Sequence, residues 1–203
     1  MMRAKTLLKS LGEGGIDLAE AFYKANNKLC EGNDAEMFVT AWMGVLDVSS
    51  GHLEFVNAGH NPPVLLRNNG SIEMLKTKAN FVLGMMDDMP YEKHEIELKQ
   101  GDVIFLYTDG LTEAQNTDDE LFGESRLLAN LESIFHNTNA SMAEVCQAVH
   151  SALKRFVGIA EQSDDITMLA LKMEKQENGV WKAILPYSET FCGPKAFEFE
   201  IDG

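Results

Sequence analysis

The chain has 203 residues and carries 17 Lys and Arg against 32 Asp and Glu, a formal net charge of −15 at pH 7. This acidic balance argues against nucleic acid or an anionic membrane as the main partner. It suits basic protein partners or bound cations, although solubility alone also accounts for it. Hydrophobic residues make up 45% of the chain, enough for one globular domain with a sizeable core.

The cysteines indicate a reducing compartment. Cys30, Cys146 and Cys192 are odd in number, far apart and in no CxxC pair, so they predict neither a disulfide framework nor a thiolate metal site. No apolar run approaches the roughly 20 residues that cross a bilayer, and the first residues lack a signal-peptide pattern. We therefore expect a cytoplasmic domain without membrane contact.

The first ~30 residues predict two helices, separated by a glycine-rich break at residues 12–15. Asp17 and Glu20 form a capping pattern at the start of the second helix. Apolar residues then recur at helical spacing: Leu18, Phe22, Ala25 and Leu29. This stripe predicts core packing rather than a binding face.

The pattern then changes to that of strands, predicted at residues 38–48, 53–57, 64–67, 72–75, 91–98 and 103–107. The nearly continuous apolar run 38–48 predicts a strand covered on both faces. The segment Asn68-Asn69-Gly70-Ser71 predicts a hairpin between the third and fourth strands. Residues 91–98 alternate as a half-exposed strand does, and residues 103–107 predict a buried strand.

Two helices and a strand over residues 166–173 follow. The second helix opens with a capping box, Ser141-Met142-Ala143-Glu144. The last stretch, residues 174–203, is weakly patterned and adds either one or two edge strands or a link to a further domain. Hairpin-rich strands with helices in blocks indicate an α+β fold, and a helix–sheet–sheet–helix sandwich satisfies the pattern.

Acidic residues stand at the ends of two predicted strands. Asp109 follows the buried strand 103–107, and Gly110 after it permits close approach of backbone or ligand. Asp164 and Asp165 come directly before the strand that starts at residue 166. If the two strands are antiparallel neighbours, the carboxylates of Asp109 and Asp164 converge on one rim of the sheet.

Clustered carboxylates without Cys or His partners suit a hard cation such as Mg(II) or Mn(II). Spacing alone also fits two ordinary turns, since Asp-Gly and Asp-Asp pairs are common in loops.

Three longer blocks favour the metal site. Residues 105–114 read Phe-Leu-Tyr-Thr-Asp-Gly-Leu-Thr-Glu-Ala and are followed by Leu-Phe-Gly at 121–123. Met-Phe-Val-Thr at 37–40 leads to Asn-Ala-Gly-His-Asn-Pro-Pro at 57–63, and Ser-Asp-Asp-Ile-Thr at 163–167 opens the final strand. Together these blocks resemble the SpoIIE/RsbU-type phosphatases, a bacterial branch of the PPM (protein phosphatase 2C-like) superfamily. Three blocks in order make the match highly specific.

The resemblance implies a four-layer α-β-β-α sandwich of the PPM type over residues 1–173, with 174–203 as a C-terminal extension. It implies that Asp109 and Asp164 bind Mn(II) or Mg(II), two ions in the complete domain. These ions activate a water that hydrolyses phosphoserine or phosphothreonine, so no protein nucleophile is needed.

Other residues of the blocks are expected to support this site. Asp165 is expected beside the metal ligands rather than on the metal, and Gly110 permits the close approach. Asn57 is expected to form loop hydrogen bonds. His60 is expected to have a positioning role in its loop rather than to act as an acid, because a lone His is more often structural.

The implied substrate is a phosphorylated protein, an anti-anti-sigma-type regulator of bacterial signalling. The sequence leaves the oligomeric state open, a homodimer included. A non-catalytic, partner-binding module of the same fold is the alternative. A generic acidic cation-binding domain explains Asp109 and Asp164 but not the other blocks.

One family block has no counterpart in the chain. Family members carry Asp-x-Ser-Gly-Lys/His-Gly before the first long helix, and its Asp bridges both metals. Residues 1–9 instead resemble the helix after that block. We therefore expect the domain to be N-terminally incomplete, without its first strands and bridging carboxylate, and poorly active alone.

Overall fold

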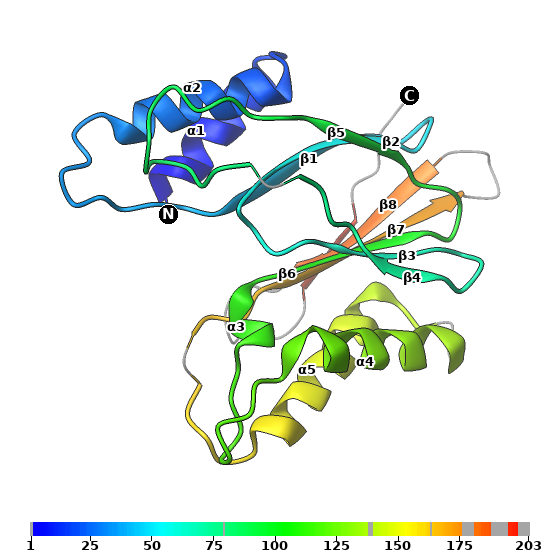
Figure 1. Ribbon diagram of the computed structural model, residues 1–203. Coiled ribbons are helices and arrows are strands. Elements are labelled where there is room, and N and C mark those ends of the chain that lie inside the picture. The colour runs from blue at the N-terminus through cyan, green and yellow to red at the C-terminus, as the bar shows by residue number, and fades with distance from the viewer. Residues whose placement is uncertain are drawn as a thin grey trace. The chain divides into compact units, whose positions relative to one another are not determined.

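The computed structural model describes residues 2–78, 80–137, 140–162, 164–175, 181–187 and 195–198 (Figure 1). Ser163 and Cys192, which the sequence analysis named, therefore lie outside the described residues. The chain forms two compact units, which we describe one at a time. Unit 1 comprises residues 1–60 and 77–97, and unit 2 comprises residues 61–76 and 98–203.

Unit 1 pairs two helices with a three-stranded antiparallel sheet of order β1-β2-β5. Its elements are α1 (Met2–Glu13), α2 (Leu18–Cys30), β1 (Ala41–Asp47), β2 (His52–Ala58) and β5 (His94–Glu97). The two predicted helices and the break between them are confirmed. The Asp17 side chain caps α2 by accepting a hydrogen bond from the Ala19 amide at 2.9 Å. Leu18, Phe22 and Ala25 are buried in a core shared with β2, as the apolar stripe predicted.

The prediction for residues 38–48 is wrong in one respect. The strand begins only at Ala41, and none of its residues is buried. Val45 is 49% exposed, and Phe38, outside the strand, is 55% exposed. The reason is topological: β1 lies at the edge of its sheet and is paired along its length with β2 alone among the described strands.

Unit 2 contains a six-stranded antiparallel sheet of order β4-β3-β6-β7-β8-β9. Its strands are β3 (Val64–Leu66), β4 (Ile72–Met74), β6 (Val103–Tyr107), β7 (Met168–Lys175), β8 (Trp181–Tyr187) and β9 (Lys195–Glu198). The predicted hairpin is confirmed, with Val64 opposite Met74 and Leu66 opposite Ile72. The last two strands extend the sheet beyond β7.

Three helices complete unit 2: α3 (Asp109–Thr112), α4 (Gly123–Asn137) and α5 (Met142–Val157). The capping box at Ser141 is present in full. The helices α4 and α5 cover one face of the sheet (Figure 1) and share with β6 a core that includes Phe105, Leu131 and Val149. Helices combined with antiparallel sheets confirm the predicted α+β class. No helix within the described ranges is long and apolar enough to span a bilayer.

Candidate active site

The site is built on the two central strands of unit 2. Strands β6 and β7 are antiparallel neighbours, with Tyr107 at the end of β6 opposite Met168 at the start of β7. One step further, the Thr108 amide donates a hydrogen bond to the Thr167 carbonyl at 3.1 Å. Asp109 and Asp164 therefore leave the sheet at the same rim, which is the arrangement expected from the order of the two segments.

Gly110 brings the two segments into contact. This residue is buried, and a Cβ atom added to it would lie 2.5 Å from the carbonyl oxygen of Asp165 and 3.3 Å from the carbonyl carbon of Asp164. Only glycine permits this approach without a shift of the backbone. The chain turns directly into the short helix α3, which starts at Asp109.

Thr108 locks the same contact, and the sequence analysis did not single it out. Its hydroxyl accepts a hydrogen bond from the Thr167 amide at 2.9 Å and donates one to the Asp165 carbonyl at 3.0 Å. One side chain thus binds the backbone on both sides of Ile166. The only sequence signal for this role is a threonine directly before the Asp-Gly pair. Its hydrogen-bond partners, Thr167 and Asp165, can be identified only when the pairing of β6 with β7 is known.

The two carboxylates are available for a cation. Asp109 Oδ1 accepts a hydrogen bond from the Gly110 amide at 3.0 Å, and Asp164 Oδ1 accepts one from the Asp165 amide at 2.7 Å. Both side chains are exposed, and neither Oδ2 atom accepts a hydrogen bond from a described residue. Such an oxygen-only donor set fits Mg(II) or Mn(II). Asp165 is also exposed, and its carbonyl oxygen is held by Thr108.

Two ligands do not complete a centre of this kind. Within the described ranges, neither Asp109 nor Asp164 belongs to a group of three His, Cys, Asp or Glu ligand atoms within 4.8 Å of one another. A hard cation takes six or more oxygen ligands, supplied in part by water. The described residues at this rim therefore supply fewer ligands than such a centre takes.

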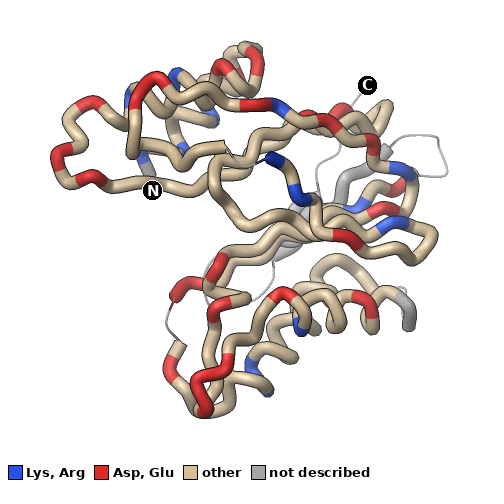
Figure 2. The backbone as a smooth tube through the Cα atoms, in the orientation of Figure 1, with Lys and Arg blue, Asp and Glu red and all other residues tan. Residues whose placement is uncertain are grey.

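The rim is acidic along both segments that form it. Glu113, Asp118, Asp119 and Glu120 follow Asp109, and Glu161 precedes Asp164; all are exposed. Figure 2 shows acidic residues at α3, on the loop that leads from α3 to α4, and on the chain leading towards β7. The net negative charge raises the local concentration of cations.

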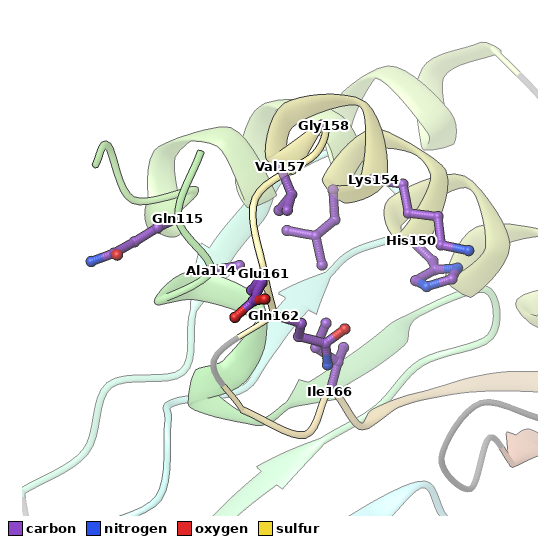
Figure 3. Close-up of a pocket in the computed structure, with 10 residues that line it drawn as sticks. Ala114, Gln115, His150, Lys154, Val157, Gly158, Glu161, Gln162 and Ile166 are labelled. Carbon is purple, nitrogen blue, oxygen red and sulfur yellow. The ribbon is translucent and has the colours of Figure 1, made fainter. Parts of the chain in front are cut away.

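A cavity of about 210 Å³ lies beside the rim, between the end of α5 and the segment that precedes β7 (Figure 3). Leu153, Val157 and Ile166 give it an apolar lining, and His150 stands on its α5 side. Burial lowers the pKa of His150, and the charge of Lys154 lowers it further. Gln162 also lines the cavity, and its side-chain amide donates a hydrogen bond to the Asp164 carbonyl at 2.6 Å.

Asn57 and His60 belong to unit 1, where they close a tight loop after β2. The Asn57 side chain accepts a hydrogen bond from the His60 amide at 2.8 Å and donates one to the His60 carbonyl at 2.9 Å. Gly59 between them has a φ of 72°, which favours glycine. The His60 ring lies 3.5 Å from the Thr40 hydroxyl. These contacts hold the loop closed on itself and connect it to Thr40.

This fold is that of the metal-dependent PP2C-type phosphatase domains. The SiaA-PP2C domain of Pseudomonas aeruginosa superposes with a TM-score of 0.70 at 23% identity, over 84% of this chain and 68% of that one. The phosphatase domain of SpoIIE from Bacillus subtilis, solved after soaking with manganese, superposes with a TM-score of 0.60 at 18% identity, over 85% and 74%.

The sequence matches the Stage II sporulation protein E (SpoIIE) family over residues 1–174, and the chain belongs to that family. Protein IcfG of Synechocystis is 33% identical over 141 residues, which are 70% of this chain and 22% of that protein. Phosphoserine phosphatase RsbU of Bacillus subtilis is 25% identical over 172 residues, 85% of this chain and 50% of RsbU. The chain thus spans half or less of the length of these two relatives.

Proposed function

We propose that this protein is a metal-dependent phosphatase that removes phosphate from serine or threonine of a signalling protein, an anti-anti-sigma-type regulator. The observation that carries the proposal is the convergence of Asp109 and Asp164 on one rim, each with a carboxylate oxygen that accepts no hydrogen bond from a described residue. Its support includes membership of the SpoIIE family and the likeness to RsbU, a phosphoserine phosphatase.

Each residue of the rim has a distinct task in this proposal. Asp109 and Asp164 would hold Mn(II) or Mg(II), and Gly110 and Thr108 keep the two ligands at a fixed separation. Asp165 contributes its carbonyl to that contact rather than to the metal. A bound metal pair would activate a water for in-line attack and neutralise charge on the phosphoryl oxygens. In unit 1, Asn57 and His60 would keep the shape of the loop that follows β2.

We infer that a third carboxylate completes the centre, because two octahedral ions need more than Asp109 and Asp164 supply. The described part of the chain brings no such ligand to the rim. The 203-residue chain assayed by itself is therefore expected to turn over slowly. The same shortage favours the second candidate, a non-catalytic module that binds a phosphorylated or basic partner.

The test is Mn(II)-dependent hydrolysis of a phosphoserine peptide, assayed with the 203-residue chain and with a longer polypeptide carrying an upstream Asp-x-Ser-Gly segment. Asp109→Asn and Asp164→Asn should each lower kcat at least about a hundredfold, as expected when a metal ligand is lost. Asp118→Asn, an equal change of charge on the same exposed segment, should leave kcat within about threefold, since it adjusts only long-range electrostatics. Full activity in the Asp109→Asn protein would exclude the proposed centre. Absence of turnover in every form, with retained partner binding, would favour the non-catalytic module.

A further inference from the structure

A second group of metal-ligating side chains lies in unit 1, on one face of its sheet. His52 and Glu54 alternate along β2, and Glu95 of β5 is directly opposite Glu54. The Nε2 atom of His52 is 3.9 Å from Glu54 Oε1 and 3.9 Å from Glu95 Oε2. One ligand atom from each of the three residues lies within 4.8 Å of the others.

The charged residues on this face give a net negative charge between Glu54 and Glu95. Glu54 and Glu95 form a like-charged pair directly across the two strands, which is unfavourable when nothing compensates it. Lys93 compensates Glu54 only from one side, at 2.7 Å, and divides its charge with Asp17 at 3.1 Å. Among the described residues, the only ion-pair partner of Glu95 is His52.

An imidazole with two carboxylates defines a ligand set different from that of the rim in unit 2. Imidazole nitrogen suits Zn(II) and its neighbours in the transition series, whereas oxygen-only sets suit Mg(II) and Mn(II). We propose that His52, Glu54 and Glu95 bind a Zn(II)-type transition-metal ion that cross-links β2 to β5. Glu54 Oε1, the oxygen that lies 3.9 Å from His52, also accepts the Lys93 ammonium at 2.7 Å, so binding of the ion would move Lys93 towards Asp17.

The separations are close to those that such an ion needs. Nitrogen and oxygen ligands about 2.0–2.2 Å from a tetrahedral Zn(II) lie about 3.3–3.6 Å from one another. The two observed 3.9 Å separations therefore have to shorten by about 0.3–0.6 Å, and the two glutamate oxygens, which lie within 4.8 Å of each other, have to approach as well. The three side chains are 39%, 32% and 54% exposed, so they can rotate without disturbing the core and leave the fourth position to water.

The test is calorimetric titration of the protein with Zn(II), in an Asp109→Asn/Asp164→Asn background so that the rim does not contribute. We expect one Zn(II) ion per chain, bound with micromolar or tighter affinity. His52→Gln and Glu95→Gln should each weaken binding at least about tenfold, as the loss of a ligand does. Co(II) bound at the same site should give a visible d–d absorption that is lost in His52→Gln.

Glu97→Gln is the matched control. Glu97 lies on the same strand, opposite His52, and carries the same charge as Glu95, but it is outside the ligand group. Its substitution should weaken Zn(II) binding less than about threefold, because it alters only the surrounding charge. Absence of stoichiometric binding, or equal losses in Glu95→Gln and Glu97→Gln, would overturn the proposal. Circular dichroism of each variant shows whether a loss of binding reflects a loss of fold. If His52→Gln is unfolded, the comparison of Glu95→Gln with Glu97→Gln tests the proposal.

Discussion

Gly110 lies against the backbone of Asp165 so closely that a Cβ atom at position 110 would be 2.5 Å from the Asp165 carbonyl oxygen. The contact is between two backbone segments, and neither can move away as the end of a flexible side chain can. It fixes the distance between the turn after β6 and the turn before β7, and hence the relation of Asp109 to Asp164. The glycine therefore has a positional role that does not depend on its φ angle.

Replacing Gly110 by alanine should separate the two turns. We expect Gly110→Ala to reduce the free energy of unfolding by about 1–3 kcal/mol, the usual cost of overpacking a tight site. It should also weaken Mn(II) binding. Urea unfolding and calorimetric titration with Mn(II) measure the two effects.

Gly12→Ala is the matched control for that experiment. A Cβ atom at Gly12 would also meet a close neighbour, Met43 Cε at 2.4 Å, but this is the tip of a flexible side chain. In a helix the change to alanine should alter stability by no more than about 1 kcal/mol. Equal losses of stability and of Mn(II) binding in the two variants would show that the contact of Gly110 with the Asp165 backbone does not position the two turns.

The two hydrogen bonds of the Thr108 hydroxyl should contribute to the stability of the fold and to Mn(II) binding. Thr108→Val keeps the branched shape but leaves the Thr167 amide and the Asp165 carbonyl without this partner. We expect a loss of about 1–3 kcal/mol in the free energy of unfolding, together with weaker Mn(II) binding. Thr108→Ser, which retains the hydroxyl, should restore most of both. A valine variant indistinguishable from the serine variant would contradict this role.

The sequence predicted the rim because the relevant signals are local. An apolar run that ends in Asp-Gly, and Asp-Asp that precedes another apolar run, predict two strands with carboxylates at their ends. Antiparallel pairing in the observed register, with Tyr107 opposite Met168, then places Asp109 and Asp164 at one rim. The helices were predicted equally well, because capping residues such as Asp17 and Ser141 act within a single turn.

Features that depend on partners distant in sequence could not be predicted. The run 38–48 is apolar enough for a covered strand, but the position of β1 at a sheet edge exposes it. The two hydrogen bonds of Thr108 require the pairing of β6 with β7. The group around His52 depends on the register of β2 against β5, and a change of one residue would place Glu95 on the opposite face.

Asp47 should make the stability of unit 1 depend on pH in the acid range. Its carboxylate accepts hydrogen bonds from the Ser49 and Ser50 hydroxyls at 2.7 and 2.8 Å and from the Ser49 amide at 2.9 Å. These bonds, those of Ser49 first, lower its pKa from the ordinary 3.8 to about 2. Because the pKa is lowered in the folded state, the stabilisation is complete above the ordinary pKa and is lost as the pH falls towards 2.

The corresponding measurement compares wild type with Asp47→Asn by urea unfolding between pH 2 and 7. The difference in stability should be constant from pH 5 upward and should shrink steadily below pH 4, the window set by a shift from 3.8 to about 2. Ser50→Ala, which removes one of the donors, should show the same trend with a smaller amplitude. A difference that grows on acidification would contradict the sign of the shift.

Ser141 should stabilise α5 and, through it, the wall of the cavity beside the rim. The Ser141 hydroxyl accepts a hydrogen bond from the Glu144 amide at 3.3 Å, and the Glu144 carboxylate accepts one from the Ser141 amide at 2.8 Å. Ser141→Ala should cost about 1 kcal/mol in the free energy of unfolding, the typical effect of losing an N-cap. Ser151→Ala is the matched control, because Ser151 lies within α5 and its hydroxyl donates a hydrogen bond to the Gln147 carbonyl four residues earlier, at 2.8 Å. Since alanine is the better helix former, that variant should be neutral or slightly more stable in the same urea titration, and a loss equal to that of Ser141→Ala would show that the cap contributes nothing of its own.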